Sequence, residues 1–208
     1  MNRTDLAVYF IMGTPNCKHD PLVVLEAALK AGVTIFQLRE KGENALRGKD
    51  LERFAIACQM LCKEYNVPFI VNDDVELALK INADGVHVGQ DDIALGEIRT
   101  RFDGKIVGVS VHTKEEMDNA VAGGADYVGI GPIFETKSKS DAKKPAGVTF
   151  LHQARTIYPE FPIVAIGGIS EQNATEVIQA GADGVAVISA ICESSNIQAT
   201  IQTFKALS

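Results

Sequence analysis

Short apolar runs alternate with amphipathic segments from one end of the chain to the other. The runs are rich in Val, Ile, Phe and Tyr, a composition typical of strands that are buried on both faces of a sheet. We therefore predict strands at each of them. The predicted strands cover Val8–Gly13, Thr34–Arg39, Pro68–Asn72, Gly85–Val88, Ile106–Val111, Tyr127–Ile133, Ile163–Gly167 and Val185–Ser189.

Between these runs, apolar positions recur with the period of a helix that buries one face. Strict alternation of strands and helices predicts a parallel sheet with right-handed crossovers. Eight such units favour closure into a (β/α)₈ TIM barrel that forms a single domain over residues 1–208. The predicted helices cover Leu22–Ala31, Leu51–Tyr65, Val75–Ile81, Leu95–Arg101, Lys114–Ala122, Phe150–Ile157, Glu171–Ala180 and Ile197–Ala206.

A short motif of Ala, Gly and Asp or Val recurs where four of the helices give way to the next strand. It occurs at residues 31–33, 83–85, 124–126 and 181–183. Glycine there can adopt the left-handed conformation that ends a helix, and aspartate suits a tight turn. We assign these residues structural roles and no catalytic role.

The charge of the chain narrows the choice of partners. A net charge of −7 gives no global attraction to nucleic acid or to an anionic membrane, so we expect neither as a partner. Small-molecule substrates remain, and a phosphate group on them must be held by local donors. The pattern does not indicate an oligomeric state.

Nothing in the sequence resembles a targeting or membrane-spanning segment. The apolar run near the N-terminus is too short for a signal peptide, and no stretch approaches the roughly 20 apolar residues that cross a bilayer. The four cysteines lack the spacing of a zinc site. We expect them to be reduced thiols and the protein to be cytoplasmic.

Polar residues follow several of the predicted strands at the end where barrels of this type keep their active sites. Arg39 and Lys41 follow the second strand, Asp73 the third and Asp92 the fourth. Two carboxylates beside two cations favour a Mg²⁺ site that also bears a diphosphate, because Mg²⁺ completes its shell with phosphate oxygens and water. The alternative for each aspartate alone is that it caps the following helix.

Two further features favour phosphate binding. Gly167-Gly168 and Ile188-Ser189 follow the seventh and eighth strands, where many barrels bind phosphate with backbone N–H groups. The long polar loop 134–148 follows the sixth strand and is expected to act as a lid. His87 and His112 face the same region by position, and we expect hydrogen-bonding roles in its wall rather than proton transfer.

Taken together, these segments resemble the thiamin-phosphate synthase family over nearly the whole chain. QLREK, VNDD and GQDD in combination are specific to it, whereas AIGGI occurs in many phosphate-binding barrels. The matching strings are YFIMG (9–13), QLREK (37–41), FIVNDDVEL (69–77), GVHVGQDD (85–92), GVSVHT (108–113), DYVGIGPIF (126–134), AIGGI (165–169) and VISAI (187–191).

The resemblance implies an alkyl transferase of thiamine biosynthesis. It would couple 4-amino-2-methyl-5-hydroxymethylpyrimidine diphosphate with 4-methyl-5-(2-phosphoethyl)thiazole, or with its carboxylated precursor, and release diphosphate. It implies that Asp73 and Asp92 ligate Mg²⁺, and the catalytic residues it implies are Arg39, Lys41, Ser110 and Lys139. The implied substrate-binding residues are Gln37, Leu38, Arg39, Glu40, Lys41, Asn72, Ser110, Thr136, Lys137, Ser138, Lys139, Gly168, Ile188 and Ser189.

The implied roles divide the mouth between the two substrates. Residues 37–41 and Asn72 would hold the pyrimidine diphosphate, and Ser110 would contact the pyrimidine or its leaving group. Thr136 and Ser138 would bind the thiazole phosphate together with backbone groups of the seventh and eighth strand ends. Lys139 would contact the diphosphate.

The chain departs from the family pattern in the lid. The family's loop usually reads Pro-Thr-x-Thr-Lys, whereas this chain has Glu-Thr-Lys-Ser-Lys at residues 135–139. Serine keeps the hydroxyl, and glutamate in place of proline loosens the backbone and adds an anion near a phosphate.

Three other functions remain: a thiazole tautomerase of the same superfamily, a regulatory barrel that binds a phosphorylated metabolite, and a sugar-phosphate isomerase or epimerase. The combined acidic and basic residues argue against the tautomerase, and a regulatory barrel does not explain them.

Overall fold

Eight parallel strands pair side by side, and the last pairs with the first, so that the sheet is a closed barrel. This closure confirms the TIM-barrel prediction. The computed structural model describes residues 1–90, 95–136, 145 and 147–207. The strands are β1 (Val8–Met12), β2 (Ile35–Leu38), β3 (Phe69–Asn72), β4 (Gly85–Val88), β5 (Ile106–Val111), β6 (Tyr127–Ile130), β7 (Ile163–Ile166) and β8 (Gly184–Val187).

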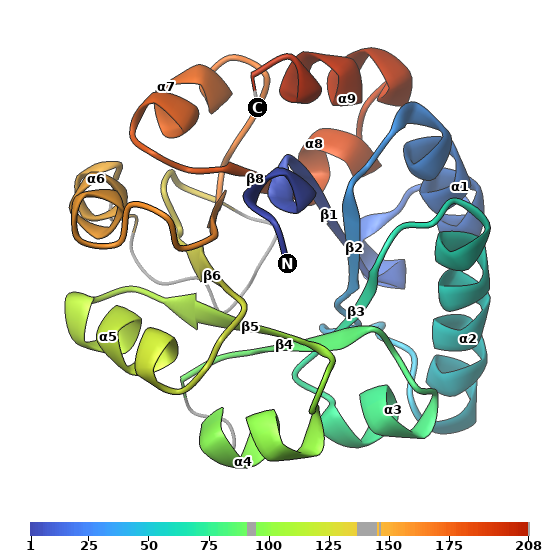
Figure 1. Cartoon of the computed structure of the whole chain (residues 1–208). Coiled ribbons are helices and arrows are strands. Elements are labelled where there is room, and N and C mark those ends of the chain that lie inside the picture. Colours follow the sequence, from blue (N-terminus) through green and yellow to red (C-terminus); the bar gives the residue numbers. More distant parts are fainter. Residues whose placement is uncertain (91–94, 137–144, 146, 208) are drawn as a thin grey trace.

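Helices form a ring around the strands (Figure 1). Each predicted helix is present, with ends that differ by a few residues. The α-helices are α1 (Pro21–Ala31), α2 (Gly48–Glu64), α3 (Val75–Lys80), α4 (Leu95–Arg101), α5 (Lys114–Ala122), α6 (Thr149–Ile157), α7 (Ala174–Gln179), α8 (Ser189–Cys192) and α9 (Ile197–Lys205). Two 3₁₀ helices, η1 (Arg3–Leu6) and η2 (Thr14–Asn16), flank β1.

Two predicted strand ends were wrong by more than one residue, and both lie at the mouth of the barrel. We expected the sixth strand to reach Ile133, but β6 ends at Ile130, because Pro132 has no N–H to give to a ladder. We expected the eighth strand to include Ser189, but Ser189 begins the short helix α8. After β6 the ladder is interrupted at Gly131-Pro132, although the Ile133 N–H still donates to the Ile166 carbonyl at 2.9 Å. After β8 the chain turns directly into α8.

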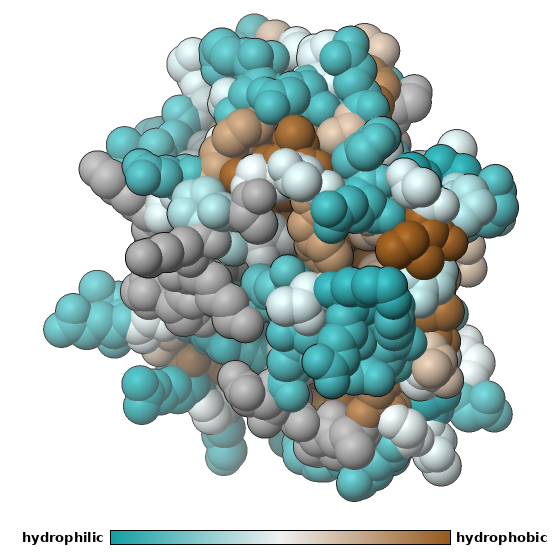
Figure 2. Space-filling view, turned by 90° about the vertical axis from the view of Figure 1, so that its left-hand side faces the viewer, coloured by the Kyte–Doolittle hydropathy of each residue, from teal (hydrophilic) through white to brown (hydrophobic). Residues whose placement is uncertain are grey.

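Five strands, β1, β2, β4, β6 and β8, are buried along their whole length, as their apolar composition predicted, and β3, β5 and β7 are buried at most of their residues. Leu6 of η1 is also buried, and η1 contacts β7 and β8, so the N-terminal segment covers the end of the barrel where the strands begin. The face of the molecule that Figure 2 shows is mostly hydrophilic, with apolar residues in small separate patches. Within the described residues, no helix is both long and apolar enough to cross a membrane.

The recurring Ala-Gly-Asp motif fastens neighbouring strands in pairs at the end opposite the mouth. The Asp84 carboxylate accepts from the Phe69 N–H at 2.8 Å, while the Asp84 N–H donates back to the Phe69 carbonyl at 3.1 Å. Asp126 does the same with Val107, and Asp183 with Ile163. These two-way contacts, which we call strand clamps, give the motif the structural role that we assigned to it.

The fourth strand clamp uses a hydroxyl instead of a carboxylate. The Thr34 Oγ1 accepts from the Val8 N–H at 3.0 Å, and the Thr34 N–H donates to the Val8 carbonyl at 3.0 Å. The four clamps therefore join β1 to β2, β3 to β4, β5 to β6 and β7 to β8.

Candidate active site

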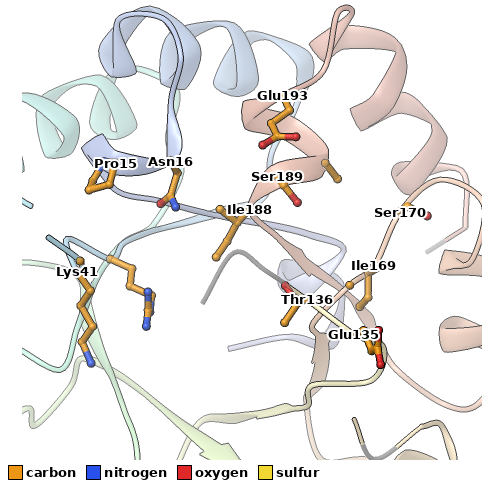
Figure 3. A pocket seen from close by; sticks show the side chains of 14 residues that line it. Pro15, Asn16, Lys41, Glu135, Thr136, Ile169, Ser170, Ile188, Ser189 and Glu193 are labelled. Carbon is orange, nitrogen blue, oxygen red and sulfur yellow. The ribbon is translucent and has the colours of Figure 1, made fainter. Parts of the chain in front are cut away.

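A cavity of about 690 Å³ opens at the mouth, within the range of about 300–1,000 Å³ that is usual for small-molecule sites. Its walls come from the segments that follow β1, β2, β6, β7 and β8. Lys41 lies on one side of it, and Thr136 and Ser189 lie toward the other (Figure 3). The predicted site residues that line it are Arg39, Lys41, Thr136, Gly168, Ile188 and Ser189.

The cationic wall of the cavity carries two basic side chains from the end of β2. Arg39 is buried, with 7% of its surface exposed, while the Lys41 side chain is 45% exposed. The Lys41 ammonium forms an ion pair with the Asp73 carboxylate at the end of β3. The sequence placed Asp73 beside Arg39 and Lys41, and the structure shows that Lys41 is its ion-pair partner. It means that a cation and a carboxylate meet at the mouth before any ligand enters.

Asp73 has a backbone conformation that non-glycine residues rarely adopt. Its φ angle is 60°, in the left-handed region, which costs an ordinary side chain about 1–2 kcal/mol. The Asp73 N–H donates to the His87 carbonyl at 2.8 Å, which ties the end of β3 to β4. Strain of this kind persists where the surrounding structure fixes it, and it is common at functional sites.

The helix cap that we considered for Asp73 belongs to its neighbour. Asp74 is the N-cap of α3, and its carboxylate accepts from the Leu77 N–H at 2.9 Å. The carboxylate of Asp73 is directed instead to Lys41. Of these two adjacent aspartates, Asp74 therefore caps a helix, and Asp73 faces the mouth of the barrel.

Some of the predicted site residues lie outside the part of the chain that the structure describes. They are Asp92, Lys137, Ser138 and Lys139. Among the described residues there is no group of three or more His, Cys, Asp and Glu side chains that could hold a metal ion by itself. This finding leaves room for Mg²⁺, because that ion commonly uses only one or two carboxylates and takes its other ligands from phosphate and water.

A chain of hydrogen bonds runs through the interior of the barrel. The Gln37 amide donates to the Tyr9 hydroxyl at 2.7 Å, and the hydroxyls of Tyr9 and Tyr127 lie 2.6 Å apart. The Tyr127 hydroxyl lies 3.0 Å from His87 Nδ1, and His87 Nε2 lies 2.9 Å from the Ser110 Oγ. Both phenols are buried, and burial raises the pKa of each well above its usual range, so both keep their protons.

Three residues of the predicted QLREK segment have contacts within the protein. Gln37, which donates to Tyr9, has 1% of its surface exposed. Leu38 is buried in β2, with 2% of its surface exposed. The Glu40 carboxylate accepts from the N–H groups of Thr14 and Leu46, both at 2.8 Å, and from the Thr14 hydroxyl. Glu40 therefore joins the loops after β1 and β2, which both border the cavity.

The opposite wall is built from tight turns after β7 and β8. Gly168 has a φ of 65°, and a Cβ there would lie 2.3 Å from the carbonyl oxygen of Glu135. Only glycine therefore fits beside the segment that follows β6. The Asn173 amide donates to the Gly168 carbonyl at 3.0 Å and holds this turn in place. Ser189 begins α8 at the same wall.

The sequence did not point to several residues that the structure brings to this region. Pro15 and Asn16, after β1, line the cavity, although we considered strand ends only from the second strand onward. Their position after a strand was the signal that could have found them. Tyr9 and Tyr127 lie within strands, where apolar periodicity alone gives no sign that their hydroxyls face the interior. His112, which the sequence did point to, contacts Glu116 of α5, with 3.1 Å between Nδ1 and Oε2.

A family model described as thiamine monophosphate synthase matches residues 8–191. The chain is 60% identical to a protein named thiamine-phosphate synthase from Lysinibacillus sphaericus, over 100% of this chain and 98% of that protein. It is 53% identical to the protein of the same name from Anoxybacillus flavithermus, over 95% and 91% of the two chains.

Solved structures agree in fold. The thiamine phosphate pyrophosphorylase of Pyrococcus furiosus matches with a TM-score of 0.86 and 31% identity, covering 99% of this chain and 96% of that one. A 4-hydroxy-2-oxoglutarate aldolase matches with a TM-score of 0.70 at 16% identity, which shows a shared fold only.

Proposed function

The chain belongs to the thiamine monophosphate synthase family, and from that membership we propose how its residues perform the coupling of a pyrimidine to a thiazole. The acceptor is the thiazole phosphate, and the donor is the pyrimidine methyl diphosphate. The thiazole nitrogen bonds to the exocyclic CH₂ of the pyrimidine as the C–O bond to diphosphate breaks, so that thiamine phosphate and diphosphate are the products.

The diphosphate binds at the cationic wall. Arg39 and Lys41 place two positive charges at the cavity, and Lys41 already holds the Asp73 carboxylate. When diphosphate enters, Lys41 can contact both the carboxylate and a phosphate oxygen. Negative charge grows on the leaving group during bond breaking, so cations fixed beside it stabilise the transition state more than the ground state.

Asp73 fits a magnesium ligand. Its side chain is only 26% exposed, it is held by a strained backbone at the mouth, and it is not used as a helix cap. Asp92 would be the second carboxylate. When bound, Mg²⁺ would add positive charge beside the diphosphate oxygens and thereby favour departure of that group.

Ser110 presents its hydroxyl hydrogen to the pyrimidine or to its leaving group. Gln37 donates to Tyr9, so the arrangement that gives every phenol hydrogen an acceptor runs from Tyr9 to Tyr127 and on to His87 Nδ1. His87 is then neutral with its hydrogen on Nε2, which donates to the Ser110 Oγ. Among the described residues the Ser110 hydrogen has no other acceptor, so it is available to the ligand. Gln37, Tyr9, Tyr127 and His87 act in this proposal as positioning residues.

The thiazole phosphate binds at the opposite wall. Thr136, Ser189 and the backbone of Gly168 border that side of the cavity, at the strand ends where barrels commonly bind phosphate. Ile188 lines the cavity and is itself almost fully buried, so its contribution is backbone and shape. Glu40 and Leu38 support the cavity from behind: Glu40 holds the two loops together, and Leu38 packs in the core.

All four cysteines are free thiols, which supports a location in the reducing cytoplasm.

The observation that carries the proposal is that Lys41, which pairs with Asp73, lines the same cavity as the turns after β7 and β8. We expect the protein to form thiamine phosphate and diphosphate from the two precursors in the presence of Mg²⁺, as measured by chromatography of the product. Lys41→Met should abolish most turnover. Lys30→Met, which removes an exposed lysine that pairs with Glu26 on α1, is the matched control and should not. Absence of product with both precursors and Mg²⁺ would overturn the assignment.

A further inference from the structure

Two cysteines that are far apart in the sequence meet beside the cavity. The sulfur atoms of Cys17 and Cys192 lie 3.8 Å apart, although 175 positions separate them. Cys17 directly follows η2, after β1, and Cys192 ends α8, after β8. Since β1 and β8 pair to close the barrel, the two thiols lie where the first and last strands of the sheet come together.

The residues next to these cysteines form part of the cavity wall. Pro15 and Asn16 precede Cys17, while Ser189 and Glu193 flank Cys192, and all four line the cavity (Figure 3). A covalent bond between the two sulfurs would therefore tie together two segments that border the ligand. It would also pull on α8, whose first residue, Ser189, lies at the proposed thiazole-phosphate wall.

We propose that Cys17 and Cys192 are a modification site, a dithiol that a peroxide converts to a reversible disulfide, and that this bond weakens binding at the adjacent wall. A disulfide has its sulfurs about 2.05 Å apart, so the pair must close by somewhat under 2 Å. The effect on binding rests on the proposed function of that wall, whereas the formation of the disulfide is independent of that function.

The two thiols differ in a way that sets the order of reaction. Cys17 is partly exposed, whereas Cys192 is buried, so an oxidant reaches Cys17 first. The hydrogen bond with Cys192 lowers the pKa of Cys17, and this effect outweighs burial and the nearby carboxylates of Glu40 and Asp20, which raise it. The same contact and burial raise the pKa of Cys192. The thiolate is the nucleophile in such chemistry, so Cys17 is the attacking group.

The reaction balances with hydrogen peroxide as the oxidant. The Cys17 thiolate attacks one peroxide oxygen, the O–O bond breaks, and hydroxide leaves and takes up a proton to become water; Cys17 is then a sulfenic acid. The Cys192 sulfur attacks the Cys17 sulfur, the S–O bond breaks, and a second water leaves with the Cys192 proton. Two thiols and one peroxide thus give one disulfide and two waters. A small thiol reverses the bond by exchange.

The chain supplies its own control. Cys58 and Cys62, both on α2, are fully buried. Burial raises the pKa of Cys62 to about 12 and that of Cys58 further. Neither has an exposed face from which an oxidant could attack, so both should stay reduced under conditions that oxidise Cys17.

The test is to treat the full-length protein with hydrogen peroxide, block the remaining thiols, and map peptides by mass spectrometry. We expect a peptide pair joined through Cys17 and Cys192, lighter by two hydrogens, with Cys58 and Cys62 alkylated. The linked pair should disappear after dithiothreitol. Cys17→Ser and Cys192→Ser should each prevent it, and Cys58→Ala should not. Stable oxidation of Cys17 without linkage to Cys192, or linkage through Cys58 or Cys62, would overturn the proposal.

The second readout is kinetic. In the oxidised protein we expect the apparent Michaelis constant for the thiazole phosphate to rise roughly tenfold, the equivalent of losing one or two neutral hydrogen bonds. Dithiothreitol should restore it, and Cys17→Ser should keep the reduced-state value throughout. A disulfide that forms without changing this constant refutes the effect on binding. If the reduced protein makes no thiamine phosphate but the disulfide still forms, the proposed function fails and the modification site stands.

Discussion

Asp73 and Asp74 are adjacent in the chain, but their carboxylates have separate partners. The Asp74 carboxylate accepts from the Leu77 N–H and caps α3, while the Asp73 carboxylate pairs with Lys41 at the mouth of the barrel. A helix cap contributes to stability and is independent of ligands. A carboxylate beside a cation at a cavity is available to a metal. The two positions therefore make a matched pair for mutation.

Asp73→Asn should lower turnover strongly and raise the Mg²⁺ concentration needed for half-maximal activity, because an amide binds Mg²⁺ less well than a carboxylate. Asp74→Ala should instead cost about 0.5–2 kcal/mol of unfolding free energy through loss of the cap. Its Mg²⁺ dependence should be unchanged. Activity against Mg²⁺ concentration and urea unfolding of both variants separate the two roles. An Asp73→Asn protein with normal activity in excess chelator contradicts the metal assignment.

Tyr127→Phe should affect both stability and catalysis. It removes the hydroxyl that joins Tyr9 to His87 and leaves buried polar groups without a partner, at a cost of about 1–3 kcal/mol. The ¹⁵N chemical shifts of His87 should show loss of the tautomer with its hydrogen on Nε2, and turnover should fall.

The control for this variant is Tyr158→Phe, whose hydroxyl contacts Asp118 at a partly exposed site, 2.6 Å away. It should change stability little and leave the His87 signal unaltered. An unchanged His87 tautomer in Tyr127→Phe would show that the hydrogen-bond chain does not orient Ser110.

Gly168→Ala should weaken the thiazole-phosphate site beyond the general cost of a left-handed alanine. The added Cβ would lie 2.3 Å from the Glu135 carbonyl oxygen, so the segment after β6 must move. Gly104→Ala is the control, because Gly104 has a similar φ of 71° with nothing within 4 Å of the added atom. Melting temperatures and Michaelis constants for both variants decide the matter, and equal effects at the two positions would count against a tight wall at Gly168.

Lys139 and Ser138, in the loop after β6, should differ in what they change. Lys139→Ala should reduce turnover more than thiazole-phosphate binding, because a cation beside a leaving diphosphate gains most as charge builds up there. Ser138→Ala removes one neutral hydrogen bond, worth about 0.5–1.5 kcal/mol, and should raise the Michaelis constant by no more than roughly tenfold. Ser138→Thr should be near neutral. Steady-state kinetics of the three variants test this division, which intact turnover in Lys139→Ala would refute.

An electron-withdrawing substituent on the pyrimidine should slow the chemical step strongly. We expect the bond to diphosphate to break ahead of bond formation to the thiazole nitrogen, so the pyrimidine CH₂ carries positive charge in the transition state. Arg39 and Lys41 at the mouth favour the same order, because they stabilise the departing group, and Mg²⁺ would add to this effect when bound. Single-turnover rates with the substituted diphosphate measure this directly, and a nearly unchanged rate would indicate direct displacement.

The sequence predicted what depends on local pattern and missed what depends on side chains meeting across the barrel. The strands could be predicted because residues buried on both faces form apolar runs, and polar strand ends such as Arg39 and Asp73 stood out against them. The end of β6 and the start of α8 could not be predicted, because Ile133 and Ile188 continue an apolar pattern after the regular strand has ended.

The Lys41–Asp73 ion pair and the contact between Tyr9 and Tyr127 were likewise out of reach of the sequence. Their partners lie 32 and 118 positions apart, so only the register of strands in the closed barrel brings them together. The spacing of residues along one helix or strand does not reveal contacts between residues that are so far apart in the sequence. The contacts of Glu40 were out of reach for the same reason: its place in QLREK predicts a ligand contact, and only the structure shows that its oxygens accept from Thr14 and Leu46.

The four strand clamps bear on how this gene can be recombined. Each clamp closes within one consecutive pair of strands, so the chain consists of four two-strand modules that carry their own fastening. In each clamp one strand contributes only its backbone N–H and carbonyl, which any parent supplies, while the other contributes the side-chain acceptor of Thr34, Asp84, Asp126 or Asp183. A chimera of homologous parents therefore keeps all four clamps wherever its breakpoints fall, provided that an acceptor is retained at these four positions. Loss of one acceptor should lower the yield of folded chimeras more than the position of a breakpoint does.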